Sequence, residues 1–119
     1  ALPLLSIAAI NGVAAGIGRD RLIVDPGFGF GKQLTHNLAL LRGLRRIAGL
    51  GFPLLVGVSR KSLIGTITGK PVDQRVHGSV ALAVYAALNG ASIVRCHDVG
   101  ATVDAMRMIA AVAGGHQDG

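Results

Sequence analysis

Short, nearly continuous apolar runs recur along the chain and predict buried strands. The runs span residues 22–24, 54–58 and 92–94. Each run is partly β-branched and shows no polar–apolar alternation, which is typical of strands that are covered on both faces. No internal repeat and no low-complexity linker interrupts the chain. The pattern therefore predicts three strands of one buried sheet.

Helical periodicity fills the segments between these runs. Residues 38–48 carry apolar side chains at helical spacing and end at Gly49. Residues 80–88 are apolar almost all round, which predicts a deeply covered helix. A last helix is expected from Thr102 as its N-cap, and residues 1–15 show a weaker helical pattern. The buried stripe expected for the last helix is Val103, Met106, Ala110 and Ala113.

The alternation of helices and strands predicts an α/β fold. Strands joined through helices by short connections run parallel and cross over with a right hand. In such sheets the carboxyl ends of all strands lie at one edge, and that edge carries the chemistry. The residues that follow each strand are therefore the first place to look for a site.

Composition narrows the class of protein. The 119 residues include 12 Lys+Arg and 6 Asp+Glu, a net charge of +6, which is compatible with an anionic ligand. Aromatic side chains make up 3% and Trp is absent, so stacking platforms for nucleic acid are scarce. Cys96 is the single cysteine, which excludes a disulfide framework. The uncharged first 18 residues are too interrupted to be a signal peptide or a membrane span. We expect a cytoplasmic protein without nucleic-acid or membrane partners.

The first strand run ends in the sequence IVDPGFGFGK, residues 23–32. Asp25 can accept two parallel N–H bonds from a flat, amidine-like heterocycle, or it can simply stabilise the turn that follows. The glycines of this segment let the backbone approach a ligand closely. Phe28 and Phe30 are candidates for an apolar wall, with loop packing as the alternative.

The other two strand runs end in cations. Residues 59–62 read Ser-Arg-Lys-Ser, and a helix beginning there could hold an anion. Arg95 and His97 are two residues apart at a strand end and can both donate to phosphate oxygens. Cys96 between them is expected to point the other way and is interpreted as a packing residue. The combined rim suits a ligand that has both a donor-rich heterocycle and a phosphate.

At these residues the sequence resembles the dihydropteroate synthase family. The resemblance rests on DPGFGFGK (25–32), residues 36–38, PLLVGVSRKSLIG (53–65), GSVALAVYAALNGA (78–91) and IVRCHDV (93–99). It implies a (β/α)8 TIM barrel, of which this chain supplies the last three parallel strands with their helices. Residues 1–119 are then one pterin-binding domain that is incomplete relative to the barrel, since three strands cannot close one.

The resemblance implies a transferase of folate biosynthesis and a sulfonamide target. The reaction joins 7,8-dihydropterin-6-ylmethyl diphosphate to p-aminobenzoate and releases diphosphate. The implied catalytic residues are Lys61, Arg95 and His97. The implied pterin-binding residues are Asp25, Gly57, Lys61 and Arg95, the diphosphate-binding residues are Arg95 and His97, and the aminobenzoate-binding residues are Phe30 and Ser62.

Family membership further implies Mg2+ on the diphosphate, with its protein ligand outside this chain. It also implies a homodimer and a missing N-terminal half of the barrel. Two other functions are open at this point. The first alternative is a non-catalytic remnant that binds pterin or diphosphate or serves as an interaction module. The second is part of a methyltransferase barrel that handles methyltetrahydrofolate. The cations at residues 59–62 and 95–98 favour the synthase, because a diphosphate leaving group needs them.

Overall fold

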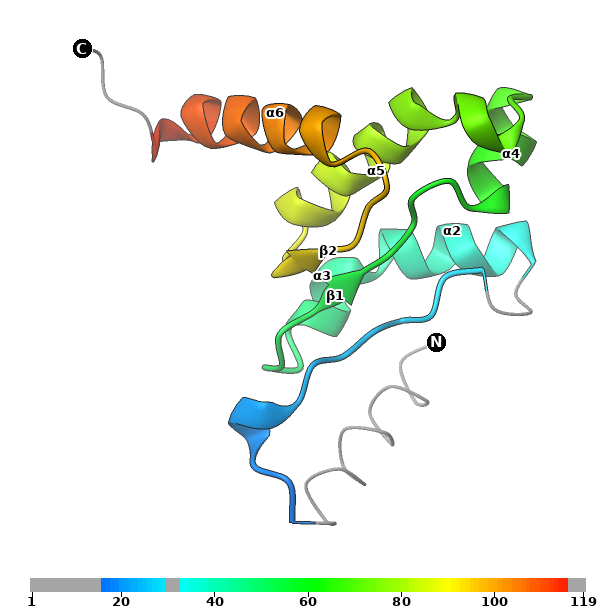
Figure 1. Ribbon diagram of the computed structural model, residues 1–119. Coiled ribbons are helices and arrows are strands. Elements are labelled where there is room, and N and C mark those ends of the chain that lie inside the picture. Colours follow the sequence, from blue (N-terminus) through cyan, green and yellow to red (C-terminus); the bar gives the residue numbers. More distant parts are fainter. Residues whose placement is uncertain (1–15, 30–32, 116–119) are drawn as a thin grey trace.

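The computed structural model describes residues 16–29 and 33–115 (Figure 1). Strand β1 (Leu55–Val56) pairs with β2 (Ile93–Val94) in parallel, with Leu55 opposite Ile93. Val24 forms a further parallel bridge to Leu54. The three apolar runs are therefore parallel neighbours in chain order, as predicted, although the regular strands are shorter than the runs. The helix expected over residues 1–15 lies outside the described residues.

Helices alternate with these strands. Three short turns are also present: the 3-10 turns η1 and η2, and the π-helical turn η3 at the end of the described chain. In chain order the elements other than the strands are η1 (Arg19–Arg21), α2 (Leu34–Arg42), α3 (Leu44–Ala48), α4 (Ser62–Thr68), η2 (Val72–Gln74), α5 (Val76–Leu88), α6 (Val99–Ala110) and η3 (Ala111–Gly115).

The helix predicted over residues 38–48 is two helices. The chain turns helical at Leu34 and breaks at Gly43, whose φ of −93° and ψ of 7° leave the helical region. The Gly43 N–H still bonds the carbonyl of Ala39 at 3.0 Å, so α2 ends in a closed cap before α3 begins. The apolar spacing predicted the shared buried face correctly, because glycine interrupts the axis without rotating that face away.

Helix α5 is less covered than predicted. It begins at Val76, and its buried apolar residues are Ala83 and Ala86, while Leu88 is 50% exposed. Helix α6 begins at Val99 with Asp98 as N-cap, so the prediction of Thr102 as N-cap is wrong by four residues. Thr102 lies inside the first turn, where its hydroxyl donates to the Asp98 carbonyl at 2.8 Å.

The predicted buried stripe of α6 is also wrong. Val103 is 40% exposed, and Ala110 and Ala113 are exposed as well. Val103, Met106 and Ala110 instead line an open groove of about 750 Å³ between α5, β2 and α6. Thr102 is the buried residue of this helix. The periodicity found an apolar face, but none of the described elements covers it.

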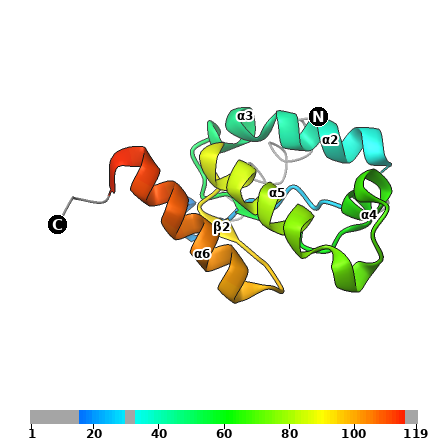
Figure 2. The same cartoon turned by 90° about the horizontal axis from the view of Figure 1, so that it is seen from above.

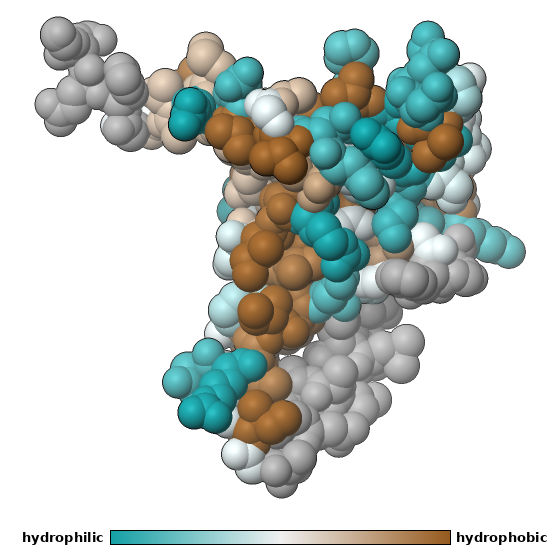
Figure 3. Space-filling model, in the orientation of Figure 1, coloured by the Kyte–Doolittle hydropathy of each residue, from teal (hydrophilic) through white to brown (hydrophobic). Residues whose placement is uncertain are grey.

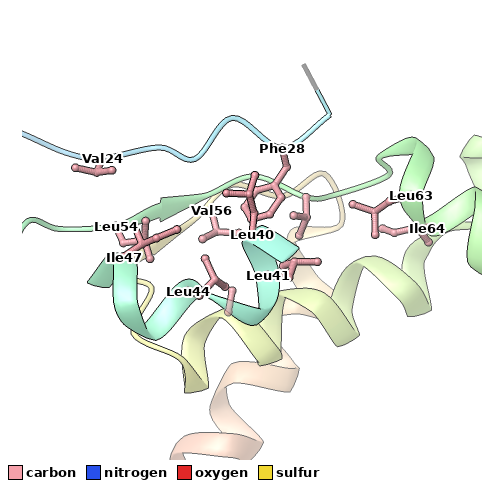
Figure 4. Close-up of a cluster of buried hydrophobic side chains, with 12 residues drawn as sticks. Val24, Phe28, Leu40, Leu41, Leu44, Ile47, Leu54, Val56, Leu63 and Ile64 are labelled. Atoms are coloured by element: carbon pink, nitrogen blue, oxygen red, sulfur yellow. The ribbon is translucent and has the colours of Figure 1, made fainter. Parts of the chain in front are cut away.

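The core lies between the strands and the helices on one side of them. Figure 4 shows side chains of α2 and α3 pointing toward the strands. Leu44 and Val56 are fully buried, and Phe28 from the glycine-rich loop closes the same cluster at 1% exposure. Phe28 is thus a core residue, and the packing alternative is the right one for it. Packing of this kind fixes where each strand ends.

The two faces of the sheet differ in their surroundings. Figure 2 shows α5 lying between the α2–α3 pair and α6. Side chains alternate along a strand, so Ile23 and Ile93 are on the opposite side from buried Val24 and half-buried Val94. Ile23 is 55% and Ile93 is 40% exposed. Figure 3, in the orientation of Figure 1, shows a hydrophobic band down the middle of the molecule. No helix in the described part of the chain is long and apolar enough to cross a membrane.

Candidate active site

Asp25 and Arg95 meet where two of the strands end. The Arg95 Nη1 lies 3.8 Å from the Asp25 Oδ2, and both side chains are partly open to solvent. The other carboxylate oxygen of Asp25 accepts the Gly27 N–H at 2.9 Å, which stabilises the turn. The turn interpretation of Asp25 therefore holds, and its other oxygen faces the Arg95 cation. An exposed pair at this separation contributes only about 0–1 kcal/mol to stability.

The Arg95 guanidinium rests directly on the backbone of Gly57, the residue after β1. A Cβ at position 57 would lie 2.5 Å from Nη2 and 2.8 Å from Cζ of Arg95. Only glycine leaves room for this approach. Gly57 therefore sets the place of the guanidinium.

Lys61 lies across the glycine-rich loop. A Cβ at Gly29 would meet the Lys61 side chain at Cδ, 3.2 Å away, and at Nζ, 3.7 Å away. Gly29 also has a φ of +85°, a conformation that favours glycine. Its N–H donates to the side-chain oxygen of buried Asn37 at 3.1 Å, which ties the loop to α2. The described part of this loop is thus tied to α2 at Gly29, and the Lys61 side chain lies against it.

His97 is fixed by Ser59. The Ser59 hydroxyl lies 2.9 Å from the His97 Nδ1 and accepts the His97 backbone N–H at 3.2 Å. A hydroxyl can donate to a neutral ring nitrogen or accept from a protonated one. The contact therefore holds the imidazole in either protonation state and leaves Nε2 for a ligand.

These side chains share a small cavity of about 130 Å³ at the strand ends. Its lining residues are Gly57, Ser59, Lys61, Arg95, Cys96 and His97. Asp25 adjoins it through Arg95, and Ser62 lies outside the lining on the first turn of α4. Cys96 lines both this cavity and the groove beside α6. It was expected to point away, but β2 ends at Val94, so strand alternation no longer applies at Cys96.

Some predicted residues fall elsewhere, and sequence reasoning missed others. Phe30 lies outside the described residues. Ser59 and Asn37 received no role, although each makes a hydrogen bond that fixes a predicted site segment. The usable signal was their position: Ser59 directly follows a strand run, and Asn37 lies in the first turn of the helix after the glycine-rich loop.

The described residues offer no cluster of three or more His, Cys, Asp or Glu side chains that could hold a metal ion. A cation is therefore not assigned to side chains of this part of the chain. The arrangement itself gathers three basic side chains, Lys61, Arg95 and His97, beside one carboxylate. It can bind an anion and, next to it, a planar group that donates N–H bonds to Asp25.

Comparison with known proteins agrees with this geometry. A dihydropteroate synthase of Neisseria meningitidis is 57% identical over 100 residues, which are 81% of this chain and 35% of that protein. The solved Xanthomonas albilineans dihydropteroate synthase with 4-aminobenzoic acid superposes with a TM-score of 0.91 at 47% identity, covering 93% of this chain and 41% of that one. A Mycobacterium bovis protein named inactive dihydropteroate synthase 2 is 36% identical over 110 residues, 92% of this chain and 35% of that protein.

The chain spans about a third of the length of these curated relatives. The structural neighbours are (β/α)8 barrels, so the three parallel strands and their helices form part of such a barrel, as predicted. The family model for pterin binding enzymes matches residues 5–97. The chain therefore belongs to the pterin binding enzyme family, and it corresponds to a region of dihydropteroate synthase.

Proposed function

We propose that this chain forms the pterin- and diphosphate-binding part of a dihydropteroate synthase. The complete enzyme would condense 7,8-dihydropterin-6-ylmethyl diphosphate with p-aminobenzoate to give 7,8-dihydropteroate and diphosphate. The observation that carries the proposal is the meeting of Asp25, Arg95 and Gly57 at the strand ends, with Lys61 and His97 on the same cavity. Residues 1–119 act as one domain that is incomplete relative to the barrel.

The pterin ring is assigned to Asp25 and Lys61. Each carboxylate oxygen has two lone pairs, so Asp25 can keep its bond to Gly27 and still accept from the amino group and ring N–H of the pterin. Lys61 donates to the oxo group and a ring nitrogen. The guanidinium of Arg95 lies flat on Gly57, and its exposed face can stack on the bicyclic ring.

The diphosphate is assigned to Arg95 and His97. In the reaction the bond between the pterin methylene and the diphosphate oxygen breaks, and the electron pair leaves with the diphosphate. The amine nitrogen of p-aminobenzoate then bonds the methylene carbon and loses a proton. Donors that are already in place where negative charge grows lower the barrier. Arg95 and His97 are catalytic residues in this sense, Lys61 is catalytic through its contact with the reacting pterin, and no covalent enzyme intermediate is needed.

The remaining assignments rest on the resemblance. Ser62 would hold the aminobenzoate carboxylate, and Phe30 would pack near its ring. Mg2+ would bind the diphosphate, with its protein ligand outside this chain. The roles proposed for Lys61, Arg95 and His97 do not require it. The homodimer and the cytoplasmic location stay predictions.

A chimeric enzyme tests the proposal. In it, this chain replaces the matching region of the Neisseria meningitidis relative. We expect release of diphosphate that depends on both substrates, and a loss of kcat/KM of about 100-fold or more in Lys61→Ala and in Arg95→Ala, the scale of a lost transition-state donor. Circular dichroism and thermal melting establish that each protein is folded. A folded chimera without turnover, or a near-normal rate in either variant, would refute the assignment.

A non-catalytic role is the second candidate, because one relative is named inactive. Its identity of 36% is well below the 57% of the Neisseria meningitidis protein. A folded chimera that binds inorganic pyrophosphate but makes no product would favour this role over the synthase.

A further inference from the structure

Arg60 has an unusual backbone for its residue type. Its φ is +59°, and every other positive φ in the described part of the chain belongs to a glycine. An arginine persists in this conformation only where its surroundings hold it there. Arg60 lies between Ser59 and Lys61, which both line the small cavity, but Arg60 itself does not line it. The unusual residue thus sets the direction of the chain as it passes the site.

Three groups from other elements hold Arg60. Its N–H donates to the hydroxyl of Ser79 on α5 at 2.9 Å, and its carbonyl accepts from Arg75 Nη1 at 3.0 Å. Ser79 is 4% exposed and donates to the Arg75 carbonyl at 2.6 Å. The backbone of Arg60 is therefore bonded on both sides to the start of α5.

The third holding group is Asp98, which belongs to the other cationic loop. The Arg60 Nη2 donates to Oδ1 of Asp98 at 3.0 Å, and Nε lies 3.5 Å from Oδ2. Asp98 directly follows His97, so this ion pair joins the loop of Lys61 to the loop of His97. Asp98 caps α6 with its backbone carbonyl, which accepts from Thr102, and its side chain makes no cap bond. The Asp98 carboxylate thus pairs with Arg60 and does not cap α6.

We infer that Arg60 is a positioning residue of the proposed site, held in its left-handed conformation by Asp98, Ser79 and Arg75. Its turn directs Lys61 onto the glycine-rich loop, and its ion pair fixes the separation between Lys61 and His97. The inference rests on the proposed function for its catalytic consequence. Its structural part, the fixing of two loops by one ion pair, stands apart from that function.

Asp98→Asn is the deciding variant, because it keeps the size of the side chain and the backbone cap while removing the charge. Asp104→Asn on the exposed side of α6 is the matched control. In the chimeric enzyme we expect Asp98→Asn to lower kcat/KM by about tenfold or more, since a misplacement near 1 Å can cost about 100-fold. The midpoint of thermal unfolding of the chimeric enzyme should stay within about 2 °C.

Arg60→Gly separates positioning from stability. Glycine adopts positive φ without strain, so this variant should unfold at an unchanged or higher temperature and yet lose activity like Asp98→Asn. A merely structural role predicts the reverse, namely activity that follows the unfolding temperature. Wild-type kcat/KM in both variants would overturn the inference.

Amide hydrogen exchange tests the positioning role of Arg60 independently of enzyme activity. In this chain, the Lys61 N–H bonds Val58 and the Arg60 N–H bonds Ser79. Both amides should exchange about tenfold or more faster in Asp98→Asn than in Asp104→Asn, because the loop opens locally. A wild-type chimera without turnover would count against the proposed function alone, whereas unchanged exchange of both amides would refute the positioning role of Arg60.

Discussion

At the scale of single residues, the site depends on the absence of side chains as much as on their presence. Because Gly57 has no side chain, the Arg95 guanidinium can lie against its backbone. In the same way, Gly29 leaves room for the Lys61 side chain beside the glycine-rich loop. The charged groups that meet there come from three separate strand ends. Each is flexible by itself, and the glycine beside it determines where its charged end can rest.

Gly57→Ala tests this dependence. The new methyl group would overlap Nη2, Cζ and Nε of Arg95, all within 2.9 Å. Because the displaced atoms are the end of a flexible side chain, the fold should survive with little change in unfolding temperature. The kcat/KM of the chimeric enzyme should fall by about tenfold or more as the guanidinium moves. Gly100→Ala is the control, since nothing lies within 4 Å of its added Cβ. Equal activity of the two variants would contradict the role given to Gly57.

At the scale of elements, the sequence predicted which segments pair but not where each one stops. Runs of apolar residues identified all three parallel neighbours, because burial on both faces leaves a continuous pattern. The pattern of apolar residues did not predict the ends of the helices as well. Gly43 breaks a helix whose periodicity continues past it, and Asp98 caps α6 through its backbone, a role any residue can fill.

In the candidate site, too, some residues could be predicted from the sequence and others could not. Asp25, Lys61 and Arg95 were predictable, because chemistry gathers at the carboxyl edge of parallel strands. Ser59, Arg60 and Asp98 were missed as a set, because their contacts join residues 38 positions apart. Periodicity and motif spacing report local structure, and a hydrogen bond between two loops leaves no local trace.

The core of α2 and α3 supports a stability prediction at this scale. Leu44 is fully buried against the strands, whereas Leu88 at the end of α5 is 50% exposed. Leu44→Ala should destabilise by about 2–5 kcal/mol through lost burial and the cavity left behind. In the chimeric enzyme, its unfolding temperature should drop by about 5 °C or more. The matched change Leu88→Ala should cost less than half of that drop. Similar shifts for the two variants would mean that the packing of α3 differs from the one described.

At the scale of the whole molecule, the part of the barrel described here leaves apolar surface uncovered. One face of the sheet exposes Ile23 and Ile93, and the groove beside α6 is lined by Val99 and Val103. Monomeric proteins rarely expose contiguous apolar patches of this kind without a partner. We expect the missing part of the barrel to cover these surfaces, because the solved Xanthomonas albilineans neighbour extends well beyond the region that this chain matches.

The isolated chain should therefore make no dihydropteroate. Its strand ends hold Asp25, Lys61, Arg95 and His97 together, but three strands cannot close around a substrate and exclude water. Charged groups in an open site work against the full dielectric of water, which weakens the stabilisation of a leaving diphosphate. Diphosphate release should stay at the level of a blank at micromolar chain concentrations, while the chimeric enzyme turns over under the same conditions. Robust turnover by the chain alone would show that closure of the barrel is not what makes this cluster catalytic.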